Sequence, residues 1–143
     1  MIEITTDRAR MDVARIYDYL SNESYWSRGI PRERVERSIE NSLCFGAFDD
    51  GVQIGFARVI TDYATFAYIA DVFVLESHRG RGVSKQIMQA IIDHPPLQGL
   101  RRWLLVTRDA QGLYAQFGFA PLDAPERHMH RLRPWLPSAP AST

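Results

Sequence analysis

The sequence predicts a single α/β domain of the α+β type, in which about four helices flank a central mixed sheet. The chain has 143 residues, which is enough for one hydrophobic core and too few for two ordinary domains. Hydrophobic residues make up 45% and charged residues 24%, as in globular domains rather than disordered chains. We expect the domain to span residues 1–133, and residues 134–143, rich in Pro, Ser and Ala, to form a flexible tail.

The N-terminal half is expected to contain one strand, two helices and a hairpin. Apolar residues recur at i, i+3, i+4 and i+7 after Asp12, a suitable N-cap, and this spacing indicates an amphipathic helix. Two apolar, β-branched runs flank Asp49-Asp50-Gly51, where glycine tolerates a positive φ, and predict an antiparallel hairpin. The expected elements are a strand at 2–5, helices at 13–20 and from Pro31 to about Asn41, and hairpin strands at 43–48 and 52–60.

The C-terminal half alternates strand and helix, which predicts a parallel pairing. The first of its strands is almost wholly apolar, with Asp71 in its middle, as expected for a strand covered on both faces. His128 and His130 alternate with other residues in a way that suits a terminal edge strand. The expected elements are buried strands at 66–75 and 102–107, helices at 83–93 and 110–117, and an edge strand at 128–132.

Composition argues against several functions. Lys and Arg number 17 and Asp and Glu number 17, so no overall field would draw the protein to nucleic acid or to an acidic membrane. No window approaches the roughly 20 apolar residues that a membrane span needs. Cys44 is the only cysteine, which excludes an internal disulfide and suits a cytoplasmic location. We expect no metal site, because no Cys and His cluster has ligand spacing.

The segment with the clearest chemistry is Arg79-Gly80-Arg81-Gly82-Val83, between the central strand and the next helix. Free amides at a helix start, together with the helix dipole, hold phosphate, and glycines allow close approach. Arg79, Arg81 and Lys85 concentrate positive charge there, and the Ser84 hydroxyl is either a further donor or a small helix-start residue. The spacing matches neither a Walker loop nor a dinucleotide fingerprint.

Residues 74–88 resemble the acetyl-coenzyme A motif of the GNAT superfamily of N-acetyltransferases. The block Asp109 to Phe119, with its Leu-Tyr and Gly-Phe pairs, is similar to the second signature of that superfamily. The sequence departs from the pattern at Ser77, where Gln or Arg is common, and at Ser84, where Gly or Ala is common. The resemblance implies an acetyl-coenzyme A-dependent N-acetyltransferase and, as cofactor-binding residues, Phe73, Val74, Arg79, Gly80, Arg81, Gly82, Val83, Ser84, Lys85, Asp109 and Phe117.

Acetyl transfer needs a neutral amine and a proton for the departing thiolate. Asp71 is a candidate general base, because a carboxylate within an apolar strand is costly unless it is used or paired; a hydrogen bond to a loop amide and a water path are the alternatives. Tyr114 matches the tyrosine that the superfamily often uses as general acid; a core aromatic that only packs is the alternative interpretation. Cys44 lacks a nearby base in sequence, which favours direct attack by the amine.

For the acceptor, we expect a small amine bound by Tyr25, Trp26 and Arg28, in the loop between the first two helices. Tyr63 is a weaker candidate, and His78 is expected at the rim of the cofactor site. The main alternative is a noncatalytic acyl-coenzyme A sensor or partner-binding module. The resemblance also implies a possible homodimer, with the segment around Met129 as the edge.

Overall fold

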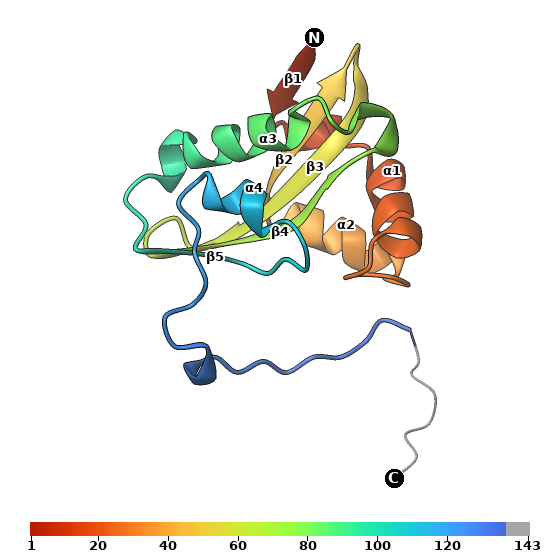
Figure 1. Cartoon of the computed structure of the whole chain (residues 1–143). Helices are drawn as coiled ribbons and strands as arrows, with labels where there is room; N and C mark the ends of the chain where they lie inside the picture. The colour runs from red at the N-terminus through yellow and green to blue at the C-terminus, as the bar shows by residue number, and fades with distance from the viewer. Residues whose placement is uncertain (137–143) are drawn as a thin grey trace.

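A five-stranded mixed sheet, with helices on both faces, organises the computed structural model, which describes residues 1–136 (Figure 1). The strand order is β1-β2-β3-β4-β5; the first three pairings are antiparallel and that of β4 with β5 is parallel, as predicted. No helix in residues 1–136 is long and apolar enough to cross a membrane. The elements are β1 (Ile2–Thr5), α1 (Val13–Asp18), α2 (Arg32–Glu40), β2 (Leu43–Asp49), β3 (Val52–Thr61), β4 (Phe66–Val74), α3 (Val83–Ile92), β5 (Arg102–Leu105) and α4 (Gln111–Ala115).

The predicted helix starts and the hairpin turn are confirmed. Asp12 caps α1, where its carboxylate accepts a hydrogen bond of 3.1 Å from the amide of Arg15. A π-helical turn, Tyr19–Glu23, continues α1. At the turn between β2 and β3, Asp50 and Gly51 have φ values of 52° and 79°, so both central residues adopt the left-handed conformation that suits a tight hairpin.

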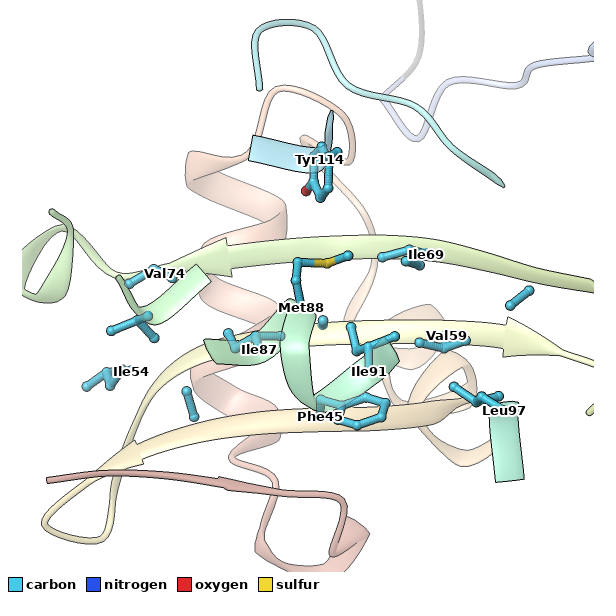
Figure 2. Close-up of a cluster of buried hydrophobic side chains, with 14 residues drawn as sticks. Phe45, Ile54, Val59, Ile69, Val74, Ile87, Met88, Ile91, Leu97 and Tyr114 are labelled. Carbon is cyan, nitrogen blue, oxygen red and sulfur yellow. The ribbon is translucent and has the colours of Figure 1, made fainter. Parts of the chain in front are cut away.

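Two hydrophobic cores lie on opposite faces of the sheet. On one face, α3 buries Ile87, Met88 and Ile91 against β2, β3 and β4, as Figure 2 shows. On the other face, α1 and α2 bury their apolar sides around Phe56 and Phe73. Because side chains alternate between the faces of a strand, the central strands serve both cores.

A bulge in β4 changes this alternation at Asp71. The pairing of β3 with β4 shifts by one residue between Phe56 and Arg58, and Asp71 has a φ of 55°. Ala67 and Ile69 therefore lie in the α3 core, whereas Phe73 lies in the core under α1 and α2. A regular strand would have sent Asp71 to the same face as Ile69. The bulge brings its carboxylate to the opposite face instead.

Two predictions for the C-terminal half are wrong. The strand expected at 102–107 ends at Leu105 and is only partly buried, because within residues 1–136 it pairs with β4 alone. Residues 128–132 form no strand. Their two-residue alternation satisfies one requirement of a strand, but no neighbouring backbone pairs with them there, and Pro134 follows closely.

The C-terminal segment returns to the body of the domain. After the single turn Pro125–Arg127, the chain runs extended beyond the edge of the sheet (Figure 1). The Leu136 side chain rests on Gly29: a Cβ added to Gly29 would lie 2.3 Å from Leu136 Cγ. The expected flexible tail begins at 134, so its first residues contact the domain; residues 137–143 lie outside the described part.

Candidate functional site

The two parallel strands separate at the bulge and leave one edge of β4 open. Pairing of β4 with β5 ends at Ile69 and Leu105, although β4 continues to Val74. The amide of Leu75 donates a 2.8 Å hydrogen bond to Ile54 in β3. Backbone groups alternate between the two edges of a strand, so those of Val74 face the open edge and those of Phe73 face β3. Of the two backbone positions proposed for the cofactor, Val74 therefore has the accessible groups.

The phosphate loop lies at the end of this open edge. Gly80 and Gly82 have φ values of 77° and 75°, and a Cβ at either position would meet nothing within 4 Å. Gly82 is the N-cap of α3 and supplies no side chain to the first amides of this ten-residue helix. A pocket of about 280 Å³ opens here, lined by Val74, His78, Arg79, Gly80, Gly82, Val83, Ser84, Lys85 and Leu113.

Side chains around the loop are tied to the rest of the domain. Arg79 folds back: its Nε donates to the carbonyl oxygen of Val74 (3.0 Å) and its Nη2 to the hydroxyl of Tyr19 (3.2 Å). His78 Nε2 lies 2.7 Å from Asp49 Oδ2 at the end of β2. Arg81 and Lys85 are exposed beside it, although Arg81 does not line the pocket.

Tyr114 projects from α4 onto the α3 face of β4, beside the open edge (Figure 2). The residue is 8% exposed, and its ring makes an edge contact with Phe119. Burial raises the pKa of the Tyr114 hydroxyl, and the nearby phenol of Tyr25 raises it further. Within residues 1–136 no hydrogen bond engages this hydroxyl. The group is thus held in its protonated form, as a general acid requires.

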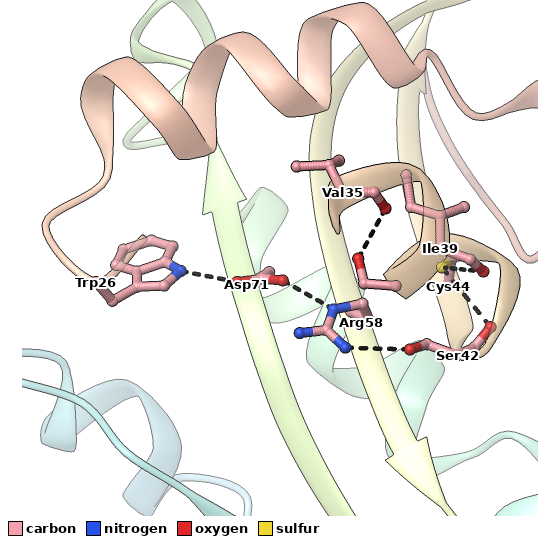
Figure 3. A network of polar contacts seen from close by, with 8 residues as sticks. Trp26, Val35, Ile39, Ser42, Cys44, Arg58 and Asp71 are labelled. Carbon is pink, nitrogen blue, oxygen red and sulfur yellow. Dashed lines mark hydrogen bonds and ion pairs between the residues drawn. The ribbon is translucent and has the colours of Figure 1, made fainter. Parts of the chain in front are cut away.

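The Asp71 carboxylate is fully engaged at the bulge (Figure 3). Its Oδ1 accepts a 2.8 Å hydrogen bond from Trp26 Nε1, and its Oδ2 accepts one of 2.8 Å from Arg58 Nε. Arg58 also donates to the hydroxyl of Ser42 (3.1 Å). Only 7% of the Asp71 side chain and 17% of the Arg58 side chain are exposed. The sequence offered a hydrogen bond to a loop amide as an alternative to a general base. The Asp71 carboxylate is indeed paired, but its partners are an indole and a guanidinium.

The predicted acceptor loop closes over the separated strands. The Tyr25 hydroxyl accepts a 3.0 Å hydrogen bond from the amide of Arg108, whose guanidinium lies 3.9 Å from the centre of the Tyr25 ring. Trp26 meets Tyr25 edge-on, with ring centres 5.0 Å apart. The loop between α1 and α2 is thereby joined to the loop between β5 and α4. Arg28 is exposed on the same loop.

Three further predicted residues lie outside the phosphate-loop pocket. Tyr63, with a φ of 61°, lies in the turn before β4 at the far end of the strand from the phosphate loop. The six residues from Phe66 to Asp71 alone span about 17 Å. Asp109 is exposed and pairs with Arg108 at 3.5 Å, and Phe117 packs against the α3 core.

Four residues that line the pocket or contact a predicted site residue were not themselves predicted: Tyr19, Arg58, Arg108 and Leu113. Tyr19 and Arg58 sit in amphipathic or alternating stretches where nothing in the sequence separates them from core and surface residues. A buried cation on β3 could have been inferred from Asp71, because a buried carboxylate requires a partner. Arg108 directly precedes the second signature block and lacked any chemical signal of its own.

Known proteins share this fold. The profile of the acetyltransferase (GNAT) family matches residues 13–119. A curated relative from Gibberella zeae, whose name assigns it provisionally to the acetyltransferases, is 30% identical over 135 residues, which cover 79% of this chain and 75% of the relative. A GNAT-family structure from Xanthomonas campestris is 52% identical and superposes with a TM-score of 0.92 over 95% of this chain and 96% of that one. A Clostridium acetobutylicum protein solved with acetyl-coenzyme A has the same fold, at 16% identity and a TM-score of 0.69, over 91% of this chain and all of that one (100%).

Proposed function

The chain belongs to the GNAT family of acetyltransferases, and from that premise we propose that it transfers an acetyl group from acetyl-coenzyme A directly to a small amine-bearing acceptor. Members of this family use acetyl-coenzyme A. One observation carries the proposal: the phosphate-loop pocket, the open backbone edge of Val74 and the hydroxyl-bearing ring of Tyr114 lie along the same end of β4. Acetyl-coenzyme A carries an anionic diphosphate toward one end and a reactive thioester at the other. It can therefore bind along β4 with the diphosphate at the loop and the thioester beside Tyr114.

The loop residues are suited to hold the diphosphate. The missing side chains at Gly80 and Gly82 expose backbone amides, and the N-terminus of α3 adds positive potential. Lys85 and Ser84 offer a charged and a neutral donor within the same pocket. The backbone of Val74 would pair with the amide-bearing arm of the donor. Arg79 then has to leave the Val74 carbonyl oxygen for that group to become available.

The transfer step requires one acid and one proton acceptor. The amine nitrogen attacks the thioester carbonyl carbon, a C–N bond forms, and the C–S bond breaks. Tyr114 gives its proton to the departing sulfur, and the proton lost by the amine leaves through water. Water is favoured over Asp71 because both carboxylate oxygens of Asp71 already accept hydrogen bonds. Asp71 is then a positioning residue that orients the loop of Trp26.

The acceptor is proposed to bind against the loop of Tyr25, Trp26 and Arg28. The aromatic pair provides apolar surface, since Tyr25 is 45% and Trp26 is 39% exposed. Arg28 provides a cation for an acceptor with a carboxylate or phosphate. Because the loop is joined to Arg108, the opening between the strands is bridged, which favours a small acceptor over a long peptide.

The test is release of coenzyme A thiol from acetyl-coenzyme A in the presence of a panel of small amines, with mass spectrometry of the acetylated product. An acetyltransferase gives amine-dependent thiol release that Tyr114→Phe strongly reduces. Tight binding of acetyl-coenzyme A without turnover on any amine would favour the alternative, a noncatalytic acyl-coenzyme A sensor or partner-binding module.

We also propose a homodimer in a reducing, cytoplasmic compartment. Within the described residues the outer edge of β5 is unpaired, and Met129 and Leu132 on the extended C-terminal segment are 95% and 81% exposed, which supports association through this side. Cys44 is free and buried, as suits a protein kept under reducing conditions. Light scattering of the full chain tests the dimer, and cell fractionation tests the compartment.

A further inference from the structure

A groove of about 450 Å³ runs along the outer edge of β5. Five consecutive residues, 103–107, form one wall, and α4 with residues 119–122 forms the other. Successive side chains of a strand point to opposite faces of the sheet, so a groove that contacts five consecutive residues follows the edge of the strand. None of the side chains that line this groove carries a charge.

The backbone of β5 is only half paired. In the part of the chain that the structure describes, β5 is the last strand of the sheet and pairs with β4 alone. Because the backbone groups of a strand alternate between its two edges, every second residue of β5 directs its N–H and C=O groups away from β4. A row of such groups accepts another strand. The groove therefore suits an extended peptide with apolar side chains better than a charged small molecule.

An extended segment of the same chain lacks a partner. Residues 128–132 have the two-residue alternation of a strand, and among residues 1–136 no backbone–backbone hydrogen bond involves residues 129–136. Met129 and Leu132 are 95% and 81% exposed, and they lie on opposite sides of an extended chain. Each side of the segment thus presents a large apolar side chain to solvent, which is unfavourable unless another surface covers it.

The segment is directed away from the groove of its own chain. At its start, His128 Nε2 lies 3.4 Å from Arg102 Nη1, at the beginning of β5. Beyond its end, the Leu136 side chain rests on Gly29, in the loop between α1 and α2. Between these two contacts the chain runs beyond the sheet and not along β5 (Figure 1). Its backbone is consequently open to a second molecule.

We propose that two copies of the chain exchange these segments, so that residues 128–132 of each copy enter the groove of the other and pair with its β5. The inference rests on the proposed homodimer and names its contact. An unpaired strand edge and an unpaired segment on the same chain satisfy each other in a two-fold pair, where every contact occurs twice. Tyr114 also lines the groove, so the strand from one copy covers the proposed general acid of the other.

Hydrogen exchange of the full chain, combined with light scattering at micromolar to millimolar concentration, tests the exchange of segments. We expect a dimer in which residues 128–132 and the outer amides of residues 102–106 exchange at least about a hundredfold more slowly than unpaired amides. Dilution to the monomer should abolish this protection in both segments.

Three results would overturn the inference. A monomer with both segments protected would show that the segment pairs with its own β5, and a monomer with neither protected would show that the groove stays empty. A dimer without protection would place the interface elsewhere and leave the homodimer standing. None of these measurements uses activity, so acetyl transfer is judged separately by amine-dependent release of coenzyme A thiol.

A pair of proline variants, His130→Pro and Arg131→Pro, tests the backbone pairing. Successive amides of a strand point to opposite edges, so one of these two amides faces the β5 of the other copy. Neither amide has a hydrogen-bond partner among residues 1–136, so both variants should fold. At least one should raise the dissociation constant of the dimer by about tenfold or more. His130→Ala and Arg131→Ala keep the amides and should keep the protection. A dimer equally stable in both proline variants would contradict the pairing.

Discussion

Trp26 Nε1 donates a 2.8 Å hydrogen bond to Oδ1 of Asp71, and this contact joins the loop between α1 and α2 to the bulge of β4. The bulge is also the point beyond which β4 and β5 no longer pair. One backbone irregularity therefore opens the edge of β4 and orients the loop that covers the opening. Arg58 completes the arrangement, because it compensates the buried carboxylate.

The first prediction concerns the stability of this ion pair. Asn at position 71 still accepts from Trp26 and tolerates a φ of 55°, so Asp71→Asn keeps that contact but replaces the charged acceptor that faces Arg58 with an amide NH2 donor. Removing one partner of a buried pair should lower the free energy of unfolding by about 3 kcal/mol, measured by urea denaturation. The exposed Asp123→Asn is the control. Near-normal stability with abolished turnover would contradict the positioning role and restore Asp71 as the general base.

A pair of glycines tests the phosphate loop. Gly82 and Gly99 have φ values of 75° and 82°, and a Cβ at either meets nothing within 4 Å. Alanine at either position should lower the free energy of unfolding by about 1 kcal/mol through left-handed strain. Only Gly82→Ala should also weaken acetyl-coenzyme A binding, by about tenfold or more, since its methyl group obstructs the backbone amides. Equal affinity in the two variants would exclude the loop as the diphosphate site.

Tyr114→Phe tests the general acid. Loss of the hydroxyl should reduce kcat by about a hundredfold and leave the dissociation constant of acetyl-coenzyme A unchanged. Because burial raises the pKa of Tyr114, the acid form persists through neutral pH and activity is lost only on the alkaline side; the variant should lack that alkaline decline. The half-buried Tyr68→Phe is the matched control. An unchanged kcat would return Tyr114 to a packing role.

The thiol of Cys44 should be inert in the folded protein. Burial raises its pKa to about 11, from 9.0, so at pH 8 the reactive thiolate is about a hundredfold scarcer than in an exposed cysteine. A thiol reagent should modify Cys44 only after unfolding in urea. The folded state binds the Cys44 proton more tightly than the unfolded state does. The free energy of unfolding should therefore decline as the pH rises from about 9 to 11. Rapid modification of native protein would contradict the buried position.

Local chemistry made part of the site predictable from sequence. Two glycines between an apolar run and an amphipathic helix can be interpreted without tertiary information, and both adopt the positive φ that the phosphate loop requires. Asp71 is anomalous in the sequence because a carboxylate within an apolar strand is costly unless it is paired or used. Its partners could not be predicted, because Trp26 and Arg58 reach it only through a bulge with no clear sequence signature.

The C-terminal errors have a different cause. Alternation at residues 128–132 describes which way side chains would point in a strand, but a strand exists only where backbone groups find a neighbour. The extent of β5 depends likewise on how far β4 stays beside it, which the bulge limits. Local periodicity therefore predicted β1 to β4 well and the C-terminal edge of the sheet poorly.

The most direct measurement is calorimetric titration of the protein with acetyl-coenzyme A and, in parallel, with S-acetylpantetheine, which lacks the nucleotide and diphosphate. We expect micromolar binding of acetyl-coenzyme A and at least a hundredfold weaker binding of the fragment, since the loop at Gly80 and Gly82 contributes several charge-assisted hydrogen bonds (about 1.5–3 kcal/mol each). Equal affinity for the two, or no binding of acetyl-coenzyme A at millimolar concentration, would contradict it.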